Sequence, residues 1–399
     1  MVVLALVLLG TAGCRARPGL EPLFDAGPFP DASLPDAFAP DCELSFAACR
    51  LSGGPVKVGD QLDGPRVVWT GRELIVAFDD VWASGDWTVA LAGYSLGAEE
   101  RFRLPVGRQQ DPYLTWHPQL GVGLVATDWG LRWLDGEGHP TGRFQDGGED
   151  RYRWYRAAAA APVPDGFLVA AGAWGYAEDP GLMQRVRVGR SSASFSWHTL
   201  ESGGLWPRPA FAVSPRDGMA RWLAAVRHEG PHGMLYRVDG QTLRQEAELD
   251  DLLPEGESAE VEAITEKDGD LLILYGNRLT GTQTWALWLV RLTPSFPEPP
   301  IQVEHHRIDV APNGPDGTLL HLGEEVLLGS ATIDRDYRVT VAPLVLDPPG
   351  GESPIGEPRI VVTSAFSRSP SMTATPRGFA IACFEDDSVS LAVYDCCVE

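Results

Sequence analysis

The feature of this sequence that most limits its fold is a repeat of about fifty residues. Seven short apolar segments of similar form recur, and their starting positions are separated by 49, 44, 55, 49, 55 and 53 residues. Repeats of this length that hold several short strands are typical of β-propeller blades. The segments are residues 74–78, 123–127, 167–171, 222–226, 271–275, 326–330 and 379–383. We therefore expect residues 51–399 to form one all-β domain, a single seven-bladed β-propeller with four-stranded antiparallel blades.

Turn residues separate the expected strands within each unit. Asp165-Gly166, Asp217-Gly218 and Asp268-Gly269 precede three of the apolar segments. Asp-Gly between apolar runs favours a β-hairpin, because glycine adopts the positive φ that such turns need. The best candidate for an amphipathic helix, residues 244–253, is short and is followed by Pro254. This pattern favours one β domain over two domains.

The last unit lacks one strand. The chain ends after its expected third strand, and residues 55–58, before the first unit, form an apolar stretch that no unit uses. We expect this N-terminal strand to pair with the C-terminal one and close the ring, which leaves no open sheet edge at the seam.

Four cysteines lie near the two ends of the expected ring. Cys42 and Cys49 precede the first blade, and Cys396 and Cys397 end the last one. Adjacent cysteines cannot bond to each other without backbone strain, so each C-terminal cysteine is expected to form a disulfide with Cys42 or Cys49. The alternative, a metal site, is weak because Cys42 and Cys49 are seven positions apart and no histidine is near.

The N-terminus indicates export. A short apolar run, residues 2–9, is followed by small residues and Cys14, which is the order of a signal peptide. The string Thr11-Ala12-Gly13-Cys14 resembles the lipobox of bacterial lipoproteins, in which the cysteine is diacylated and becomes the new N-terminus. We expect a lipoprotein signal peptide at 1–13 and a membrane anchor on Cys14. The alternative is an ordinary apolar leader with an incidental cysteine.

A spacer follows the expected anchor. Residues 15–41 hold six prolines and four aspartates among small residues, with no helical or strand period. Such a stretch buries too little apolar surface to fold, so residues 14–50 are expected to be a lipid-anchored flexible tether with a cysteine-bearing end. A structured pro-segment is the alternative. The expected location is the bacterial cell envelope, at the outer membrane.

The charge of the chain excludes one class of partner. There are 55 acidic and 32 basic residues, and the formal net charge is −23. A nucleic-acid-binding protein with this charge would need a basic stripe, and the sequence has none. We expect a monomer that binds no nucleic acid.

One catalytic motif is present. Gly93-Tyr94-Ser95-Leu96-Gly97 matches G-x-S-x-G and is similar to the nucleophile elbow of α/β-hydrolases. That elbow requires a helix after the serine, whereas Pro105 interrupts the following stretch and the motif falls where other units have a hairpin turn. We therefore expect Ser95 to be a turn residue, with a hydrolase as the alternative.

Signals for metal binding are weak. His305 and His306 are adjacent, so a strand would point them to opposite faces. Acidic residues near 79–80, 334–336 and 386–387 could offer oxygen ligands to Ca²⁺, although such residues are more often solvated turn ends. We expect no metal site and no cofactor, with Ca²⁺ as the alternative.

Candidate binding residues are those expected in loops on one face of the ring. In a propeller, the loops between second and third strands and between successive blades share one face, and function usually lies on such loops. The candidates for a ligand or partner surface are Asp79, Asp80, Asp128, Trp129, Trp174, Tyr176, Arg227, His228, Asn277, Arg278, Asp334, Asp336, Arg153, Arg208 and Arg368.

Two classes of function fit this pattern. Arginine and tryptophan are enriched at binding hot spots, which favours a non-catalytic binding or scaffold propeller for an envelope protein or glycan. The alternative is an extracytoplasmic glycan hydrolase or lyase that uses paired loop carboxylates.

The lipobox, the Asp/Pro/Ala spacer and the divergent repeat together resemble propeller lipoproteins of GC-rich Gram-negative bacteria such as myxobacteria. This resemblance implies location and shape, and no activity.

Overall fold

The computed structural model describes residues 40–60, 64–81, 87–107, 112–127, 130–146, 153–174, 181–187, 198–201, 208–226, 233–239, 242–249, 252, 258–282, 284–295, 298–311, 316–334, 336–347, 353–364 and 367–398. These residues all belong to the unit Leu34–Glu399. Within them, no helix has the length and hydropathy that a bilayer crossing requires. The predicted signal peptide at 1–13, the lipidation site Cys14 and most of the predicted tether lie outside the described residues.

The described residues form one short 3-10 helix, η1 (Phe46–Ala48), and seven four-stranded antiparallel sheets. We name each sheet after its first strand. The β2 sheet contains β2 (Arg66–Trp69), β3 (Leu74–Val81), β4 (Trp87–Tyr94) and β5 (Glu100–Gly107). The β6 sheet contains β6 (Tyr113–His117), β7 (Val122–Thr127), β8 (Gly130–Leu134) and β9 (Pro140–Asp146). The β10 sheet contains β10 (Arg153–Val163), β11 (Gly166–Trp174), β12 (Gly181–Arg187) and β13 (His198–Glu201). The β14 sheet contains β14 (Arg208–Val213), β15 (Ala220–Val226), β16 (Gly233–Asp239) and β17 (Thr242–Glu248). The β18 sheet contains β18 (Ser258–Lys267), β19 (Asp270–Arg278), β20 (Trp285–Ser295) and β21 (Glu298–Ala311). The β22 sheet contains β22 (Gly317–Leu322), β23 (Glu325–Asp334), β24 (Asp336–Leu344) and β25 (Arg359–Ser364). The β26 sheet contains β26 (Ser367–Thr375), β27 (Gly378–Glu385), β28 (Ser388–Asp395) and β1 (Arg50–Asp60).

Hairpin turns connect the strands as the sequence predicts. Between β18 and β19, Asp268 has φ 54° and Gly269 has φ 90°. Positive φ at both central residues is the geometry of a type I′ turn, whose twist matches that of the flanking strands. Asp386 and Asp387, between β27 and β28, also have positive φ, at 49° and 85°. This acidic pair is therefore the tip of a hairpin.

Neighbouring sheets pack face to face around a closed circle. The first strands contact one another in the order β2, β6, β10, β14, β18, β22 and β26, and β26 in turn contacts β2. Each of the seven junctions between neighbouring sheets is filled by its own apolar cluster. Second strands are covered on both faces, so β19 and β27 are buried along almost their whole length. The prediction of an all-β propeller with four-stranded antiparallel blades is confirmed.

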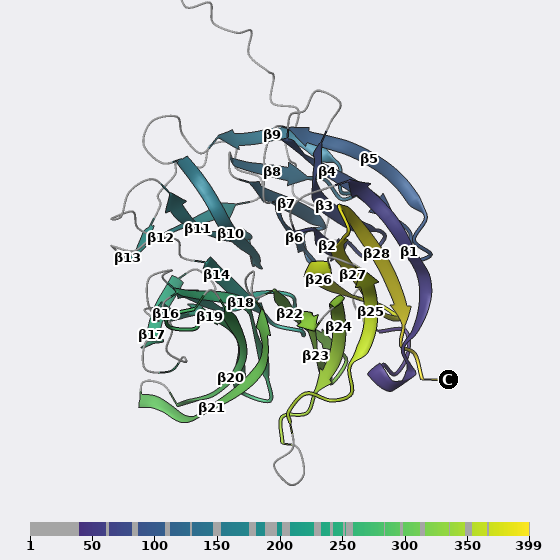
Figure 1. Ribbon diagram of the computed structural model, residues 1–399. Helices are drawn as coiled ribbons and strands as arrows, with labels where there is room; N and C mark the ends of the chain where they lie inside the picture. The colour runs from purple at the N-terminus through teal and green to yellow at the C-terminus, as the bar shows by residue number, and fades with distance from the viewer. Residues whose placement is uncertain are drawn as a thin grey trace, which may run out of the picture. The chain divides into compact units, whose positions relative to one another are not determined.

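The N-terminal strand closes the circle as predicted. β1 pairs antiparallel with β28, from Arg50 opposite Asp395 to Asp60 opposite Ser388, and Figure 1 shows β1 in purple alongside β28 in yellow. Gly54 allows this pairing, because it has φ 81° and a Cβ there would lie 2.5 Å from the carbonyl oxygen of Leu391. Both ends of the chain therefore contribute strands to one sheet.

The best helix candidate in the sequence, residues 244–253, contains a strand instead, in keeping with the expected all-β domain. Thr242–Glu248 is strand β17, which pairs with β16. Leu243 lies opposite Val238, and Leu243 and Ala247 pack against apolar clusters on either side of the sheet. Cross-strand pairing and burial outweigh the helical propensity of Arg244, Gln245 and Glu246, since propensity is only a weak preference.

A buried histidine joins two of the sheets. His117, at the end of β6, is fully buried, and its Nε2 lies 2.8 Å from the carbonyl oxygen of Val163 in β10. Its Nδ1 accepts a hydrogen bond from the Leu120 amide at 3.2 Å, so Nε2 carries the proton and donates to Val163. Burial lowers the pKa of His117 below its ordinary value of 6.5. The imidazole is therefore neutral in the folded protein.

Acid is expected to destabilise the protein through this histidine. Because the unfolded chain binds a proton near pH 6.5 and the folded one resists it, the stability that neutral His117 provides is lost as pH falls below about 6.5. In urea unfolding at about pH 7.5 and about pH 5.5, His117→Gln should show a smaller loss of stability on acidification than wild type. An equal loss in both proteins would contradict this assignment. His321, whose pKa burial also lowers, provides a second site for the same measurement.

Candidate functional site

The sheets have two distinct ends. Turns between first and second strands lie at one end, which we call the bottom; second strands finish, and the next first strands begin, at the other, the top. The candidate residues were selected for the top, where all connections between sheets and all second-to-third strand loops meet.

The N-terminal segment is fastened at the bottom. Residues 40–49, here called the clasp segment, hold Cys42 and Cys49, which form disulfides with Cys397 and Cys396. The predicted pairing of each C-terminal cysteine with one of these two partners is confirmed. The Asp41 amide also donates to the carbonyl oxygen of Pro376, in the bottom turn between β26 and β27, at 2.9 Å.

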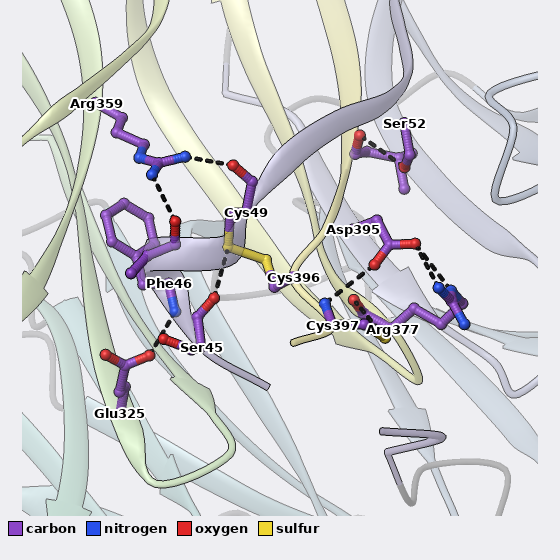
Figure 2. Close-up of a disulfide and its surroundings, with 12 residues drawn as sticks. Ser45, Phe46, Cys49, Ser52, Glu325, Arg359, Arg377, Asp395, Cys396 and Cys397 are labelled. Carbon is purple, nitrogen blue, oxygen red and sulfur yellow. Dashed lines mark hydrogen bonds and ion pairs between the residues drawn. A yellow bond between two sulfur atoms is a disulfide. The ribbon is translucent and has the colours of Figure 1, made fainter. Parts of the chain in front are cut away.

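Side chains of the β22 sheet hold the clasp segment as well (Figure 2). The Phe46 amide donates to Glu325 Oε2 at 2.6 Å, at the bottom of β23. The guanidinium of Arg359 donates to the carbonyl oxygens of Cys49 and, at 3.0 Å, Ala47, and it lies 5.3 Å from the centre of the Phe46 ring. Phe46 is buried in the cluster between the β22 and β26 sheets. The clasp segment is thus part of the folded domain.

Six of the candidate residues lie at the top by backbone position. Arg153 stands opposite Trp174, where β10 begins and β11 ends. Asp334 stands opposite Asp336 across the tight connection of β23 to β24. Arg208 is the first residue of β14 and Arg368 the second of β26, opposite Val226 and Phe384. The prediction that these residues share one end of the sheets agrees with the strand register.

Asp79 is not the loop residue that the sequence predicts. It lies inside β3, opposite Val89 of β4, and is fully buried. It occupies the face of β3 that carries Ile75 and Ala77, which pack against the β6 sheet. Its neighbour Asp80 is half-buried on the other face. There the hydrogen bond with Glu100 is the main cause that raises the pKa of Arg103, and the charge of Asp80 adds to it. Asp79 therefore lies between two sheets and away from the surface.

Asn277 is also a packed strand residue. It lies in β19, is fully buried, and accepts a hydrogen bond from Trp288 Nε1 at 3.0 Å through its Oδ1. The adjacent Arg278, the last residue of β19, is half-buried and stands opposite Ser258. Asn277 thus orients Trp288 within the β18 sheet. Of the two candidate residues Asn277 and Arg278, only Arg278 is exposed enough to contact a ligand.

The remaining candidates fall outside the described residues. These are Asp128, Trp129, Tyr176, Arg227 and His228.

The sequence analysis missed one aromatic and cationic pair at the starts of two neighbouring first strands. Arg66 is the first residue of β2, and its guanidinium carbon lies 5.8 Å from the centre of the Tyr113 ring, at the start of β6. Burial raises the pKa of the Tyr113 hydroxyl, and the Arg66 charge opposes that rise. The sequence signal that could have identified Arg66 is an arginine directly before the apolar residues of a first strand, as at Arg208.

Ser95 is a turn residue, as predicted. It follows β4, and its Oγ accepts a hydrogen bond from the Glu99 amide at 3.2 Å. The Ala98 amide donates to the carbonyl oxygen of Ser95 at 2.9 Å, and β5 begins at Glu100. A strand follows where a nucleophile elbow needs a helix, so the geometry gives the hydrolase interpretation no support.

Metal binding has no structural support among the described residues. They contain no group of three or more His, Cys, Asp or Glu side chains placed to hold an ion. Of the acidic stretches considered for Ca²⁺, Asp79 lies inside the packed β3 and the pair Asp386-Asp387 forms a hairpin tip.

Comparisons with known proteins gave matches to solved structures only. No protein-family model matches the chain. No curated protein matches it in sequence. Among solved structures, it is similar to NanB with Optactamide, at 9% identity and a TM-score of 0.47, over 86% of this chain and 70% of that one. It is similar to a point mutant of NanB sialidase from Streptococcus pneumoniae at the same identity and TM-score, over 87% of this chain and 70% of that one.

Proposed function

We propose that this protein is an exported, lipid-anchored propeller that binds a protein or glycan of the bacterial cell envelope through the top of its sheets, without catalysing a reaction. The observation that carries the proposal is that the clasp segment and the candidate binding residues lie at opposite ends of the sheets. The clasp segment, which follows the proposed tether, is fixed at the bottom turns by two disulfides. Arg153, Trp174, Arg208 and Arg368 stand at the opposite end of the sheets, on β10, β11, β14 and β26. A propeller held in this way presents its top away from the point of attachment.

The disulfides support the proposed location. Two of them join the clasp segment to the C-terminus, and such bonds persist in oxidising compartments outside the cytoplasm. The lipobox-like Cys14 supplies the proposed anchor, and the outer membrane is the proposed site of attachment. Mass spectrometry of the mature protein should find an acyl group on Cys14, and Cys14→Ser should release the protein from the membrane fraction. An unmodified Cys14 in the mature protein would overturn the anchor.

Photo-cross-linking from the two ends tests the binding surface. A photoreactive amino acid in place of Arg278 probes the top, and one in place of the exposed Arg72, in the bottom turn between β2 and β3, is the matched control. With full-length protein in its native envelope, adducts should form from position 278 and not from position 72. Adducts from position 72 alone, or none from either position, would contradict the proposal.

The alternative function has a separate readout. A glycan hydrolase or lyase would shorten the glycan that it binds, which chromatography of the reducing ends would detect. Such an enzyme needs two carboxyl groups about 5–10 Å apart across a pocket. Asp79, which the sequence suggested for such a pair, is buried between sheets. We therefore favour binding without cleavage.

A further inference from the structure

The two disulfides of the clasp segment differ in how deeply they are buried. Cys49–Cys396, which we call the inner bond, joins residues that are 5% and 0% exposed. Cys42–Cys397, which we call the outer bond, joins a half-buried cysteine to one that is 9% exposed. Cys42 is therefore the most exposed of the four bonded cysteines.

Apolar side chains and backbone cover the inner bond. Cys49 and Cys396 belong to the apolar cluster between the β22 and β26 sheets, together with Phe46. A Cβ at Gly378 would lie 3.0 Å from Cys396 Sγ, so the backbone at the start of β27 packs directly against this sulfur. The Arg359 guanidinium, which donates to the carbonyl oxygen of Cys49, lies on the same side of the segment as Phe46 (Figure 2). A thiolate would have to lose its water to reach the inner bond, which costs free energy.

Polar groups surround the outer bond instead. Cys42 lies between two exposed carboxylate residues, Asp41 and Glu43. The amide of Cys397 donates to Asp395 Oδ1 at 3.0 Å (Figure 2). Neither cysteine of the outer bond belongs to the apolar cluster that holds the inner bond. A nucleophile can therefore approach the outer bond from solvent.

The inner bond alone keeps the two ends of the domain joined. Cys49 and Cys396 link the clasp segment to the C-terminus whether or not the outer bond is present. The Val398 amide also donates to the carbonyl oxygen of Glu43 at 2.9 Å, which holds the segment near Cys42 by its backbone. Opening the outer bond would therefore free two thiols without opening the propeller.

We propose that the outer bond is a thiol–disulfide exchange site that accepts electrons from a protein dithiol, whereas the inner bond is structural. A thiolate of the dithiol attacks Cys42 Sγ and forms a mixed disulfide there, and the Cys42–Cys397 bond breaks to leave a thiolate on Cys397. The second thiol of the dithiol then attacks the mixed disulfide and releases Cys42. The dithiol is oxidised to a disulfide, and its two protons end on Cys42 and Cys397. This reaction is independent of the proposed binding surface at the top.

Variants with one bond each make the two rates comparable. Cys49→Ser with Cys396→Ser keeps only the outer bond, and Cys42→Ser with Cys397→Ser keeps only the inner bond. When dithiothreitol is added under native conditions and new thiols are alkylated, the outer-bond variant should be reduced at least ~10-fold faster, because access to the sulfur governs exchange. Urea unfolding checks that both variants fold.

The wild-type protein gives the same comparison without any substitution. After brief treatment with dithiothreitol, mass spectrometry should find the first alkyl groups on Cys42 and Cys397, with Cys49 and Cys396 still bonded. Addition of urea should remove the difference, because unfolding exposes both bonds to the reductant equally.

A protein dithiol is tested with a thioredoxin whose second active-site cysteine is replaced by serine. Such a thioredoxin cannot resolve a mixed disulfide, so it should remain attached to the wild-type protein at Cys42. The variant that keeps only the inner bond is the matched control and should capture none.

Four outcomes would overturn the proposal. They are equal reduction of the two bonds, faster reduction of the inner bond, resistance of both bonds until urea unfolds the protein, and capture of thioredoxin at Cys49 or Cys396. Rapid reduction of the outer bond by dithiothreitol without any capture of thioredoxin would show that the bond is exposed and that a protein dithiol is the wrong reductant.

Discussion

Loss of both disulfides is expected to lower the free energy of unfolding by about 9 kcal/mol, whereas loss of either one alone should cost only about 3 kcal/mol. The two bonds span 355 and 347 residues, so each closes nearly the whole chain into a loop. In the chain-entropy model, the first such closure contributes roughly 6 kcal/mol. Once one bond is in place, the other closes only the short ring through Cys42, Cys49, Cys396 and Cys397, which contributes roughly 3 kcal/mol.

Urea unfolding of four proteins measures this difference. They are the wild type, Cys42→Ser with Cys397→Ser, Cys49→Ser with Cys396→Ser, and the variant with all four changes. The buried Cys383 does not complicate the comparison in the folded state, because burial raises the pKa of its thiol to about 12 and the thiolate is the species that attacks disulfides. Losses from the two single bonds that simply add to the loss in the fourfold variant would contradict the shared-loop explanation.

The fold was predictable because the most buried strand of each sheet is also the most apolar. Second strands such as β19 and β27 are covered on both faces, so they form continuous apolar runs that recur at the blade period. The closing strand β1 was predictable because the last repeat lacked a partner. Residues 244–253 were the best helix candidate in the sequence because an outer strand has few apolar residues, and its pairing with β16 is not visible in local propensity.

The candidate site was harder to predict because strand ends are not marked in the sequence. Asp79 and Asn277 are polar residues after an apolar run, which looks like the start of a loop, yet β3 and β19 continue through both positions. Whether such a residue faces a neighbouring sheet or solvent depends on strand length and register, which long-range pairing decides. The positions of arginines at the starts of first strands were easier to predict than those of Asp79 and Asn277. A first strand begins toward the top whatever its length.

Replacing Arg291 by methionine is expected to destabilise the protein by about 3–5 kcal/mol, because it leaves a buried carboxylate without its cation. Arg291 Nε donates to Asp270 Oδ2 at 2.6 Å, and the side chains of both residues are mostly buried, at 17% and 10% exposure. Nη1 donates to Asp347 Oδ1 at 2.8 Å and to the Leu346 carbonyl oxygen at 3.0 Å, after β24. The guanidinium therefore joins the β18 sheet to the β22 sheet. In its absence, Asp270 keeps the hydrogen bond that Thr293 Oγ1 donates at 2.8 Å.

An exposed pair in the neighbouring sheet provides the control. Arg221 donates to Asp217 near the bottom of β15, and their side chains are 46% and 34% exposed, so Arg221→Met should cost less than about 1 kcal/mol. Adding Asp270→Leu to Arg291→Met removes the stranded charge and should restore a large part of the lost stability, as replacement of a whole buried pair is often tolerated. Urea unfolding of these three variants and the wild type measures the losses. Arg291→Met costing no more than Arg221→Met would mean that the Asp270 carboxylate is solvated despite its burial, and that the junction between the two sheets depends on its apolar cluster alone.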